Sequence, residues 1–511
     1  MSLQLWQSSL RSTWGPYGLA DSAKMSQTRW SMIRSSTRRL RGLALVHSDE
    51  TPLYRQICEH MRAAIRAGQL RPGDRVPSTR ELAAQFGTAR GTVDAAYAIL
   101  AGEGYLIGRG AAGTIVSTEL DSRAVVGAAG RERPNSRAKP PARNELRPLQ
   151  IGLPALDAFP RKLWSRLVAR HARAFAPTDM AYPEPSGYPP LREAIAGYLA
   201  TSRGVRCEAR QILITNGYQD ALNLAANVLL RPGDKVWLED PGYPPAAEAL
   251  KAAGAALMPI RVDPEGIRVS DGLARARRAR VAVVTPSHQN PLGVSMSLPR
   301  RLALLSWARD AGAWIIEDDY DSEFRYVGRP LPALKSLDQD ERVLYAGTFS
   351  KVLYPGLRLG YLVVPESLID TFARSFRLRY LGHAMLEQRV VSDFMAAGHF
   401  ARHLKRMRAL YGARRRTLAD NLCQVLGDRI TVELRPGGMH LIARLARGLH
   451  DVELANLAQA RGFAVDALSR RAMTHDCGQG LLVGFTNVAA SEARAVCERL
   501  RLAIGKRLNP Q

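Results

Sequence analysis

The residue with the clearest chemical potential is Lys351, which follows a predicted strand in the segment TFSKVLYPGLRLGY (348–361). A lysine amine can condense with an aldehyde, and hydroxyl groups and a guanidinium beside it can bind a phosphate. The segment supplies these groups as Thr348, Ser350 and Arg358. A lysine on its own is most often a solvated surface residue, so the prediction depends on its companions. Together they predict a site for an aldehyde cofactor that carries a phosphate.

A group of acidic residues ends another apolar strand, in EDDYDSEF (317–324). A carboxylate buried there can keep a pyridine nitrogen protonated, so that the ring acts as an electron sink. We expect Asp318 to fill this role, with Asp319 as the alternative. Tyr320 is expected to reach the hydroxyl of the ring. An acidic surface loop is the competing interpretation.

A second phosphate-binding element is predicted where ITNGYQDAL (214–222) turns from a strand into a helix. The first backbone amides of a helix are free to bind an anion. Here these amides belong to Gly217, Tyr218 and Gln219.

Two further loops carry side chains that suit a pyridine ring. TPSHQNPLG (285–293) contains Asn290, whose amide can form a hydrogen bond with the ring hydroxyl. The tight loop EDPGYP (239–244) presents Tyr243, which can stack on the ring or serve as a core aromatic residue.

The elements that must position these residues are short apolar strands separated by helical lengths. This alternation runs through residues 149–505 and predicts an α/β domain with a parallel or mixed sheet. The predicted strands are QILIT (211–215), KVWLED (235–240), VAVVTP (281–286), AWIIEDD (313–319) and RVLYAGT (342–348).

In this order, the segments resemble the fold-type I pyridoxal-phosphate (PLP) enzymes of the aminotransferase class. The resemblance implies PLP as the cofactor, a large seven-stranded cofactor domain, a smaller C-terminal domain from about residue 390, and a homodimer that shares two sites. It also implies a role for Tyr182, in AYPEPSGYPPLREAIAGYLATSRG (181–204). In relatives, a tyrosine of this segment approaches the cofactor of the neighbouring subunit.

One segment departs from the aminotransferase pattern. Aminotransferases bind the substrate α-carboxylate with an arginine in a late strand, but GLLVGFTN (480–487) has Leu481 and Leu482 at the candidate positions. Leucine replaces neither the charge nor the bidentate geometry. The absence of an arginine from this segment weighs against general transamination. It also weighs against an effector whose carboxylate would be bound by that arginine. Arg435, before PGGMH, is a candidate substitute.

A second folded part is predicted over residues 49–118. The segment LYRQICEHMRAAIRA (53–67) has an apolar face at helical spacing, and YLIGRGAAGTIV (105–116) is typical of a β-wing with a glycine-rich tip. The apolar face consists of Leu53, Ile57, Met61 and Ile65.

Between these segments lies a predicted helix-turn-helix. Ser78 and Glu81 form a capping box that begins a helix through Phe86. Gly87 can end that helix in a tight turn, and a second helix follows over about 89–103. The second helix of such a pair can enter the major groove of DNA.

This part resembles the GntR-type winged helix family over nearly its whole length. The resemblance implies DNA contacts at Arg80, Arg90 and Thr92, with Gly110 at the wing tip. An arginine can grip a phosphate or bind guanine bidentately, whereas solvated arginines on a helical hairpin are the alternative. The family has serine at the cap of the recognition helix, where this chain has Ala89; Thr88 could cap instead and shift the helix start by one residue.

Composition agrees with a nucleic-acid partner. The 511 residues carry a formal net charge of +25 with 46% hydrophobic residues, so the chain is globular but strongly basic. Its five cysteines are scattered without metal-like spacing, which predicts reduced thiols and no metal site. No apolar run reaches the length of about 18 residues needed for a membrane span.

Two further segments show no apolar periodicity. Residues 1–48 are predicted to be a disordered basic extension, or to precede the true start at Met25 or Met32, and they lack a secretion signal. Residues 119–148 are rich in proline and arginine and predict a basic linker.

A GntR domain joined to an aminotransferase-like domain is typical of the MocR (GabR-like) regulators. This resemblance implies a cytoplasmic homodimer that binds operator DNA and senses PLP, an amine or an amino acid. The alternative is a catalytically active PLP-dependent aminotransferase with a vestigial DNA-binding domain.

Overall fold

The computed structural model describes residue 45 and residues 51–120, 146–328, 331–379 and 382–508. The chain divides into two compact units, Met1–Asn144 and Glu145–Gln511. The predicted extension 1–48, apart from Leu45, and most of the predicted linker 119–148 lie outside the described residues. Within the described ranges, no helix is both long enough and apolar enough to cross a membrane.

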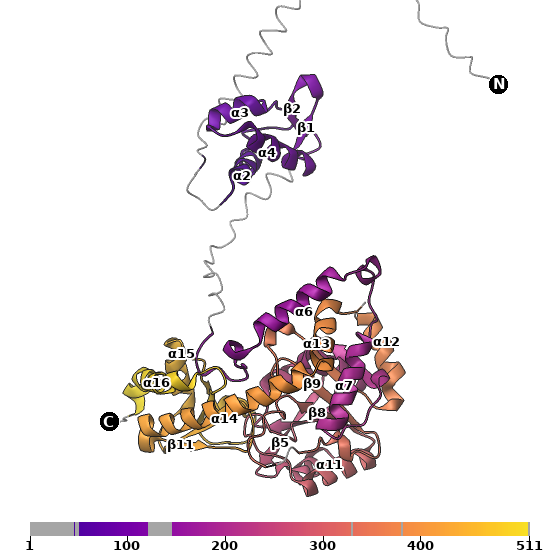
Figure 1. The fold of residues 1–511 in the computed structure, drawn as a ribbon, viewed down its shortest axis with the longest axis vertical. Coiled ribbons are helices and arrows are strands. Elements are labelled where there is room, and N and C mark those ends of the chain that lie inside the picture. Colours follow the sequence, from indigo (N-terminus) through magenta and orange to yellow (C-terminus); the bar gives the residue numbers. More distant parts are fainter. Residues whose placement is uncertain (1–44, 46–50, 121–145, 329–330, 380–381, 509–511) are drawn as a thin grey trace, which may run out of the picture. The chain divides into compact units, whose positions relative to one another are not determined.

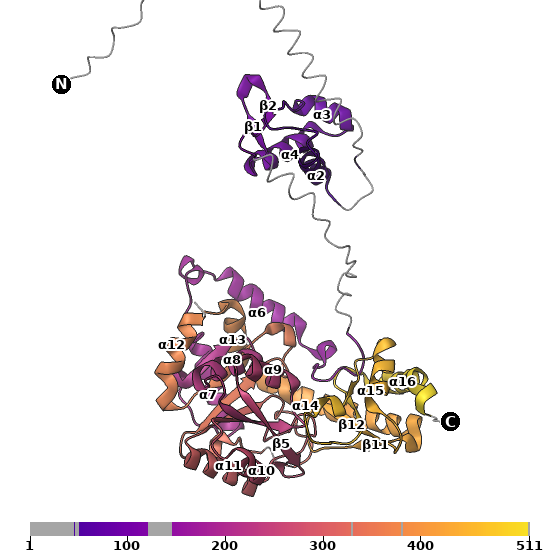
Figure 2. The ribbon, with the colours of Figure 1, turned by 180° about the vertical axis from the view of Figure 1, so that it is seen from behind.

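In its described part, the N-terminal unit is a winged helix-turn-helix (Figures 1 and 2). Its elements are α2 (Leu53–Arg66), α3 (Thr79–Phe86), α4 (Arg90–Gly102) and the antiparallel strands β1 (Leu106–Gly108) and β2 (Thr114–Val116). The three helices share one apolar core, which includes Ile57, Met61, Leu82, Val93 and Leu100. Leu45 packs against this core.

The boundaries of α3 follow the sequence signals. The hydroxyl of Ser78 accepts a hydrogen bond from the amide of Glu81 (3.2 Å), and the Glu81 carboxylate accepts one from the amide of Ser78 (2.9 Å). Gly87 ends the helix at a φ of 63°, which glycine adopts without steric cost. Helix α4 is capped by Ala89 without a side-chain hydrogen bond, so Thr88 is not the cap.

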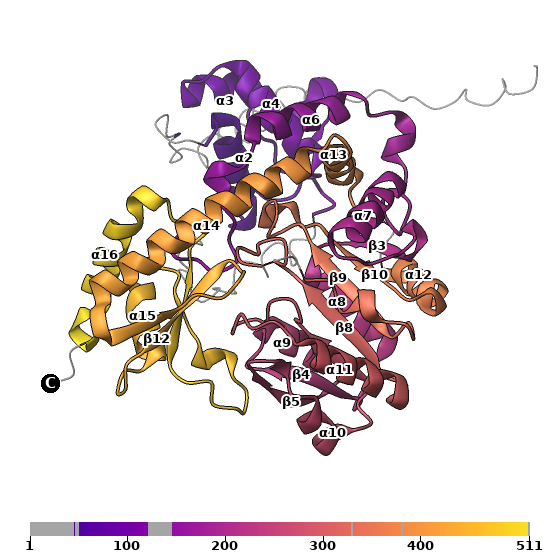
Figure 3. The same ribbon diagram turned by 60° about the horizontal axis from the view of Figure 1, so that its bottom comes forward.

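The large domain of the C-terminal unit is built on a mixed eight-stranded sheet (Figure 3). The strand order is β3 (Ile212–Thr215), β10 (Gly360–Val363), β9 (Val343–Thr348), β8 (Trp314–Asp319), β7 (Val281–Val284), β4 (Lys235–Asp240), β5 (Ala256–Asp263) and β6 (Gly266–Ile267). The strands from β9 to β5 are parallel, and β10 is antiparallel to both neighbours. The predicted number was seven; the eighth strand, β6, is a two-residue antiparallel addition to β5.

Both faces of this sheet are covered by helices, because alternate residues of each strand enter different cores. Val236 and Leu238 of β4 point to one side and Trp237 to the other. The first side carries α8 (Tyr218–Leu229), α9 (Pro244–Ala252) and α12 (Ile369–Arg379). The second carries α10 (Val269–Ala276), α11 (Leu298–Ala311) and, toward β3, α7 (Pro189–Ser202).

The small domain has an antiparallel sheet of its own. Its order is β11 (Ile430–Glu433), β12 (His440–Leu445), β14 (Gly480–Gly484) and β13 (Asp466–Ala467). Helices α15 (Asp451–Ala460) and α16 (Ala493–Leu508) pack against each other. The chain enters through α13 (Met385–Ala396), which packs on α6 (Arg161–Arg173), and the 28-residue α14 (His399–Leu426).

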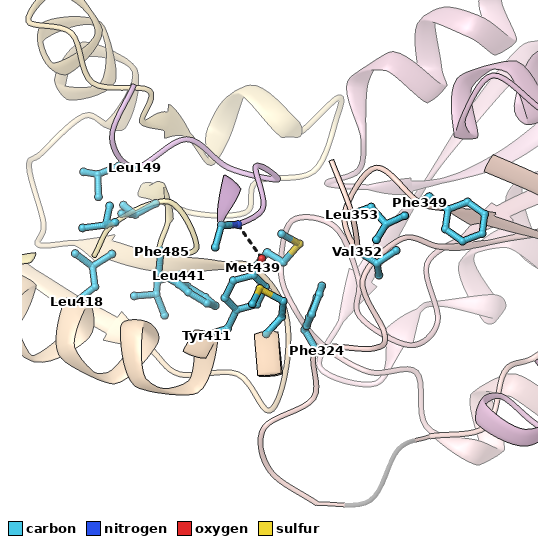
Figure 4. Packing of buried hydrophobic residues seen from close by; sticks show 14 of the residues in the cluster. Leu149, Phe324, Phe349, Val352, Leu353, Tyr411, Leu418, Met439, Leu441 and Phe485 are labelled. Atoms are coloured by element: carbon cyan, nitrogen blue, oxygen red, sulfur yellow. Dashed lines mark hydrogen bonds between the residues drawn. The ribbon is translucent and has the colours of Figure 1, made fainter. Parts of the chain in front are cut away.

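Helix α14 holds the first segment of the unit in place (Figure 4). The Tyr411 ring packs on Phe324 at 4.8 Å between centroids, and its hydroxyl accepts a hydrogen bond from the amide of Ala155 (2.9 Å). Leu149 and Phe485 belong to the same core. The segment around residue 152 is therefore fixed beside both domains.

Candidate cofactor site and DNA-binding surface

A cavity of about 420 Å³ lies where the strands β3, β4, β8 and β9 end. In open α/β sheets, ligands bind beyond the carboxyl ends of the strands because the loops there bring together residues from distant parts of the chain. Ten of the predicted cofactor residues line this cavity: Tyr218, Gln219, Tyr243, Asn290, Asp318, Tyr320, Thr348, Ser350, Lys351 and Arg358.

Lys351 presents its amine to this cavity three residues after the end of β9. Its Nζ donates a hydrogen bond to the carbonyl of Gly152 (2.9 Å). Burial lowers the pKa of Lys351, which increases the fraction of neutral amine, although Asp321 and Asp318 oppose the effect. A neutral amine is the nucleophilic form, so the environment suits condensation with an aldehyde.

Arg358 and the start of α8 form a site with several anion-binding groups. Arg358 lies in the left-handed region (φ 51°), and its guanidinium lies 3.9 Å from the position that a Cβ at Gly217 would take. Gly217 caps α8, whose first residue is Tyr218, so free helix amides and a cation meet there. The amide of Ser350 donates to the Thr348 hydroxyl (3.1 Å), and both residues line the same cavity.

The two acidic candidates on β8 lie in different surroundings. Asp318 lines the cavity, its Oδ1 is buried without a hydrogen-bond partner among the described residues, and burial raises its pKa well above the ordinary value. Asp319 is already paired, with Arg203 Nε at 2.7 Å and the Tyr345 hydroxyl at 2.5 Å. The structure thus leaves Asp318, and not Asp319, facing the cavity.

Tyr320 is held by groups outside the set found from the sequence. Its hydroxyl lies 2.9 Å from Nδ1 of His288, which in turn lies 3.2 Å from the buried carboxylate of Asp321. Asn290 also forms a hydrogen bond with Tyr320. His288 lies in the same segment as Asn290, TPSHQNPLG (285–293), but nothing in the sequence alone distinguished it from a core histidine.

Two of the residues predicted for the cofactor site differ from the rest: one does not line the cavity, and the side chain of the other bonds to a neighbouring helix. Tyr182 is 82% exposed and does not line the cavity of its own chain. The side-chain amide of Gln219 donates to the carbonyl of Pro245 (2.9 Å), so this side chain ties α8 to α9.

The predicted DNA-contacting residues are accessible on the winged helix. Arg80 on α3 and Gly110 at the wing tip are exposed, and Thr92 is half-buried in the first turn of α4. Arg90 begins α4 and lies 3.4 Å from Asp94, with about half of each side chain exposed. The hydroxyl of Tyr97 donates to the carbonyl of Pro77 (2.8 Å) and fixes the segment that precedes Arg80.

Both parts of the chain match known families. The model described as "Bacterial regulatory proteins, gntR family" matches residues 53–116, and that described as "Aminotransferase class I and II" matches residues 160–474. The chain is similar to the probable rhizopine catabolism regulatory protein MocR of Rhizobium meliloti, with 40% identity over 90% of this chain and 95% of that protein.

Two further relatives agree. The pyridoxine biosynthesis transcriptional regulator PdxR of Corynebacterium glutamicum is 35% identical over 87% of this chain and 94% of that protein. The solved structure of kynurenine aminotransferase from Pyrococcus horikoshii superposes with a TM-score of 0.64 at 28% identity, covering 71% of this chain and 91% of that one.

The chain belongs to the MocR-type transcription regulators. The predicted family, the winged helix-turn-helix and the fold-type I aminotransferase domain are confirmed. This MocR-type protein is a DNA-binding transcription regulator whose second domain has the fold of PLP-dependent aminotransferases.

The cavity of this MocR-type protein fits PLP. Asp318 offers a buried carboxylate oxygen that has no hydrogen-bond partner in the described part of the chain, as a pyridinium nitrogen requires. Arg358 beside the start of α8 offers a cation and free amides for a phosphate. Lys351 offers a desolvated amine on the same cavity wall.

The most informative residue missed by sequence reasoning is Arg471. It lines the cavity, whereas Arg435, the candidate substitute from the sequence, does not and pairs with Glu433 at 2.5 Å. Leu482 of β14 also lines the cavity. The leucine found in place of the carboxylate-binding arginine of aminotransferases therefore lies in the candidate cofactor site. The only sequence signal for Arg471 is a pair of arginines in ALSRRAM, in a chain that contains many arginines.

Proposed function

We propose that the protein binds operator DNA as a cytoplasmic homodimer and that PLP held at Lys351 makes its C-terminal domain a sensor. The observation that carries this proposal is the gathering of Lys351, Asp318 and Arg358 around one cavity in a chain that also has an accessible winged helix. The signal is PLP itself or an amine that reacts with it.

Each residue has a role in this proposal. Lys351 would hold the cofactor covalently, Asp318 would hold its ring nitrogen, and Asn290 with Tyr320 would hold its ring hydroxyl. Arg358, Thr348, Ser350 and the amides of residues 217–219 would hold its phosphate, and Tyr243 would stack on the ring. When bound, PLP supplies an aldehyde carbon that amines attack.

Arg80, Arg90 and Thr92 would bind the operator, and the wing at Gly110 would approach the DNA backbone. Support for the homodimer comes from Met180 and Tyr182, which are 75% and 82% exposed although both are large and hydrophobic. A second subunit would cover them and would bring Tyr182 to the partner's cavity.

A ligand can regulate DNA binding only by its differential affinity for two arrangements of the protein. The test is fluorescence anisotropy with labelled DNA from upstream of the protein's own gene, at one stated salt concentration, since phosphate contacts depend on salt. Operator affinity should change on loading with PLP in the wild type and not in Lys351→Ala. Operator affinity that ignores PLP and every amine tested would refute the sensor.

A working aminotransferase is the second candidate, and the presence of Lys351, Asp318 and Asn290 in one cavity favours it. Leu482 in place of the late-strand arginine weighs against it. Production of a keto acid over many turnovers from some amino donor would support the enzyme, and its absence would support the regulator.

A further inference from the structure

A second cavity lies in the C-terminal unit, apart from the cofactor cavity. Its volume is about 540 Å³, and among the described residues the two cavities share no lining residue. It is bounded by the end of α7, by the segment after β8 (residues 322–328, 331 and 332) and by α14. None of its described lining residues belongs to the predicted cofactor or DNA-binding sets. Cavities of about 300–1,000 Å³ are typical of ligand sites, so its chemistry indicates what it can bind.

Two arginines on the walls of this cavity, Arg325 and Arg408, form no ion pair within the described part of the chain. Arg408 uses Nε for a hydrogen bond to the carbonyl of Glu323 (3.0 Å), which leaves its terminal nitrogens for a ligand. Nε of Arg325 is buried, but its terminal nitrogens are not, and Nη2 lies 3.6 Å from the position that a Cβ at Gly328 would take. Gly328 lines the same cavity, so the accessible edge of this guanidinium faces it.

The other charged groups on the walls do not neutralise this pair. Arg203 is compensated by Asp319, and the carboxylate of Asp321 lines a smaller neighbouring cavity and not this one. Glu323 accepts a hydrogen bond from the Tyr198 hydroxyl (2.9 Å), and burial raises its pKa to about 7. Near neutral pH this carboxyl therefore carries only part of a negative charge. Two uncompensated cations face at most one anion, so the described lining has a net positive charge.

The wall opposite α14 is apolar and held in place by buried arginines. Arg203 donates a hydrogen bond to the carbonyl of Leu331, and Arg301 donates one to the carbonyl of Pro332 (2.7 Å). Leu331, Pro332 and Leu404 offer carbon atoms to the cavity. A wall that is fixed before a ligand arrives reduces the entropic cost of binding. The cavity thus combines two cations with an apolar surface, which suits an anion that carries a carbon chain.

We propose that this cavity is a second ligand site, which binds a small organic dianion, either a dicarboxylate or a phosphate monoester, through Arg325 and Arg408. A guanidinium suits both classes because its donors form paired hydrogen bonds to two oxygens of a carboxylate or a phosphate. Two such cations match a ligand with two negative charges, and the apolar wall contacts its carbon atoms. The site is separate from the cofactor cavity, so the proposal depends neither on the signal sensed through PLP nor on the response of the DNA.

The test compares organic dianions with neutral analogues of the same shape by isothermal titration calorimetry. The full-length protein loaded with PLP, in phosphate-free buffer at one stated salt concentration, is titrated with succinate, glutarate and glycerol 3-phosphate. The matched neutral compounds are succinamide, glutaramide and glycerol, and inorganic phosphate is the anion without a carbon chain. At least one organic dianion should bind about tenfold or more tightly than its neutral analogue and than inorganic phosphate. Succinate and glutarate against glycerol 3-phosphate tell which class is preferred.

Variants assign the binding to this cavity. Arg408→Gln and Arg325→Gln should each weaken the binding of that dianion about tenfold, because each removes one charged pair of hydrogen bonds. Arg408→Lys should lose less, because the charge stays and the paired geometry is lost. Arg406→Gln is the matched control: Arg406 is also exposed on α14 but does not line the cavity, so the affinity should stay within about twofold of the wild type.

The proposal is overturned if no organic dianion binds better than its neutral analogue, or if inorganic phosphate binds as tightly as the best of them, which would indicate an adventitious anion site only. It is also overturned if Arg408→Gln keeps the affinity of the wild type, since the dianion would then bind elsewhere, or if Arg406→Gln loses as much. Should Arg325→Gln fail to fold, Arg408→Gln decides alone, because Arg408 is exposed and its replacement leaves the core unchanged.

Discussion

The buried ion pair between Arg203 and Asp319 allows a test of whether Arg203 compensates the charge of the carboxylate next to Asp318. The two side chains are 4% and 2% exposed, and Nε of Arg203 lies 2.7 Å from the carboxylate. Arg203 also donates to the Ser287 hydroxyl (2.6 Å) and to the carbonyl of Leu331. Arg203→Met would leave the charge of Asp319 buried with the Tyr345 hydroxyl as its one remaining hydrogen-bond partner among the described residues.

We expect Arg203→Met to lower the free energy of unfolding by about 3–5 kcal/mol, the cost of an uncompensated buried charge. Changing Asp319 to Asn in the same protein removes that charge. The double variant should therefore be more stable than Arg203→Met alone, by about 2 kcal/mol. Arg203→Met should also bind PLP more weakly than the double variant. An unpaired Asp319 raises the pKa of the adjacent Asp318 further, and a protonated Asp318 cannot pair with the pyridinium nitrogen of the cofactor.

The assay is equilibrium urea unfolding of the full-length chain, followed by the fluorescence of buried tryptophans such as Trp237 and Trp307, which stack at 3.8 Å. Arg414→Met is the control. Its partner Asp157 is 59% exposed and can be solvated after the change, so the loss should be about 1–2 kcal/mol. A double variant no more stable than Arg203→Met, or an equal loss in the control, would refute the reasoning.

Three further predictions concern the other parts of the molecule. Arg90→Ala should weaken operator binding about tenfold in anisotropy titrations, as expected for a lost base or phosphate contact, whereas Arg66→Ala on α2 should change it less than twofold. Ser78→Ala removes the capping box of α3, and a loss of about 1 kcal/mol should appear as roughly fivefold faster hydrogen exchange of the α3 amides, with no change if the cap contributes nothing. Burial alone would raise the pKa of Asp240, but hydrogen bonds from residues 473–475 outweigh burial and lower it. Because the pKa of Asp240 is lower in the folded than in the unfolded protein (about 4), its ionised carboxylate stabilises the fold above that pH, and this stabilisation is lost as pH falls through the folded pKa. In thermal unfolding, the difference in stability between the wild type and Asp240→Asn should therefore be constant from pH 7 to about 5 and should disappear below about pH 4.

Local signals in the sequence predicted much of this structure. The capping box at Ser78 and the glycine at 87 set the limits of α3, because capping and left-handed turns depend on adjacent residues. KVWLED coincides with β4, since a strand buried on both faces needs an unbroken apolar run. The lysine and the aspartate proposed to hold the cofactor were identifiable because Lys351 follows β9 and Asp318 lies at the end of β8.

Other features depend on contacts between distant residues. Asp318 and Asp319 are adjacent and chemically identical, and only the packing of Arg203 against β8 separates the one that faces the cavity from the one that is paired. The sequence offered Arg435 as the substitute arginine and gave no reason to choose Arg471, which the fold places at the cavity next to the loop that follows β4.

The sequence by itself determined the two modules and the cofactor that they imply, and it supplied the residues proposed to hold that cofactor, because strand ends, helix starts and side-chain types are local properties. Only the tertiary structure decided which charges are compensated, because compensation requires groups that lie far apart in the chain. Arg203 pairs with Asp319, which lies 116 positions further along the chain, and this pairing leaves Asp318 as the carboxylate that lines the cavity.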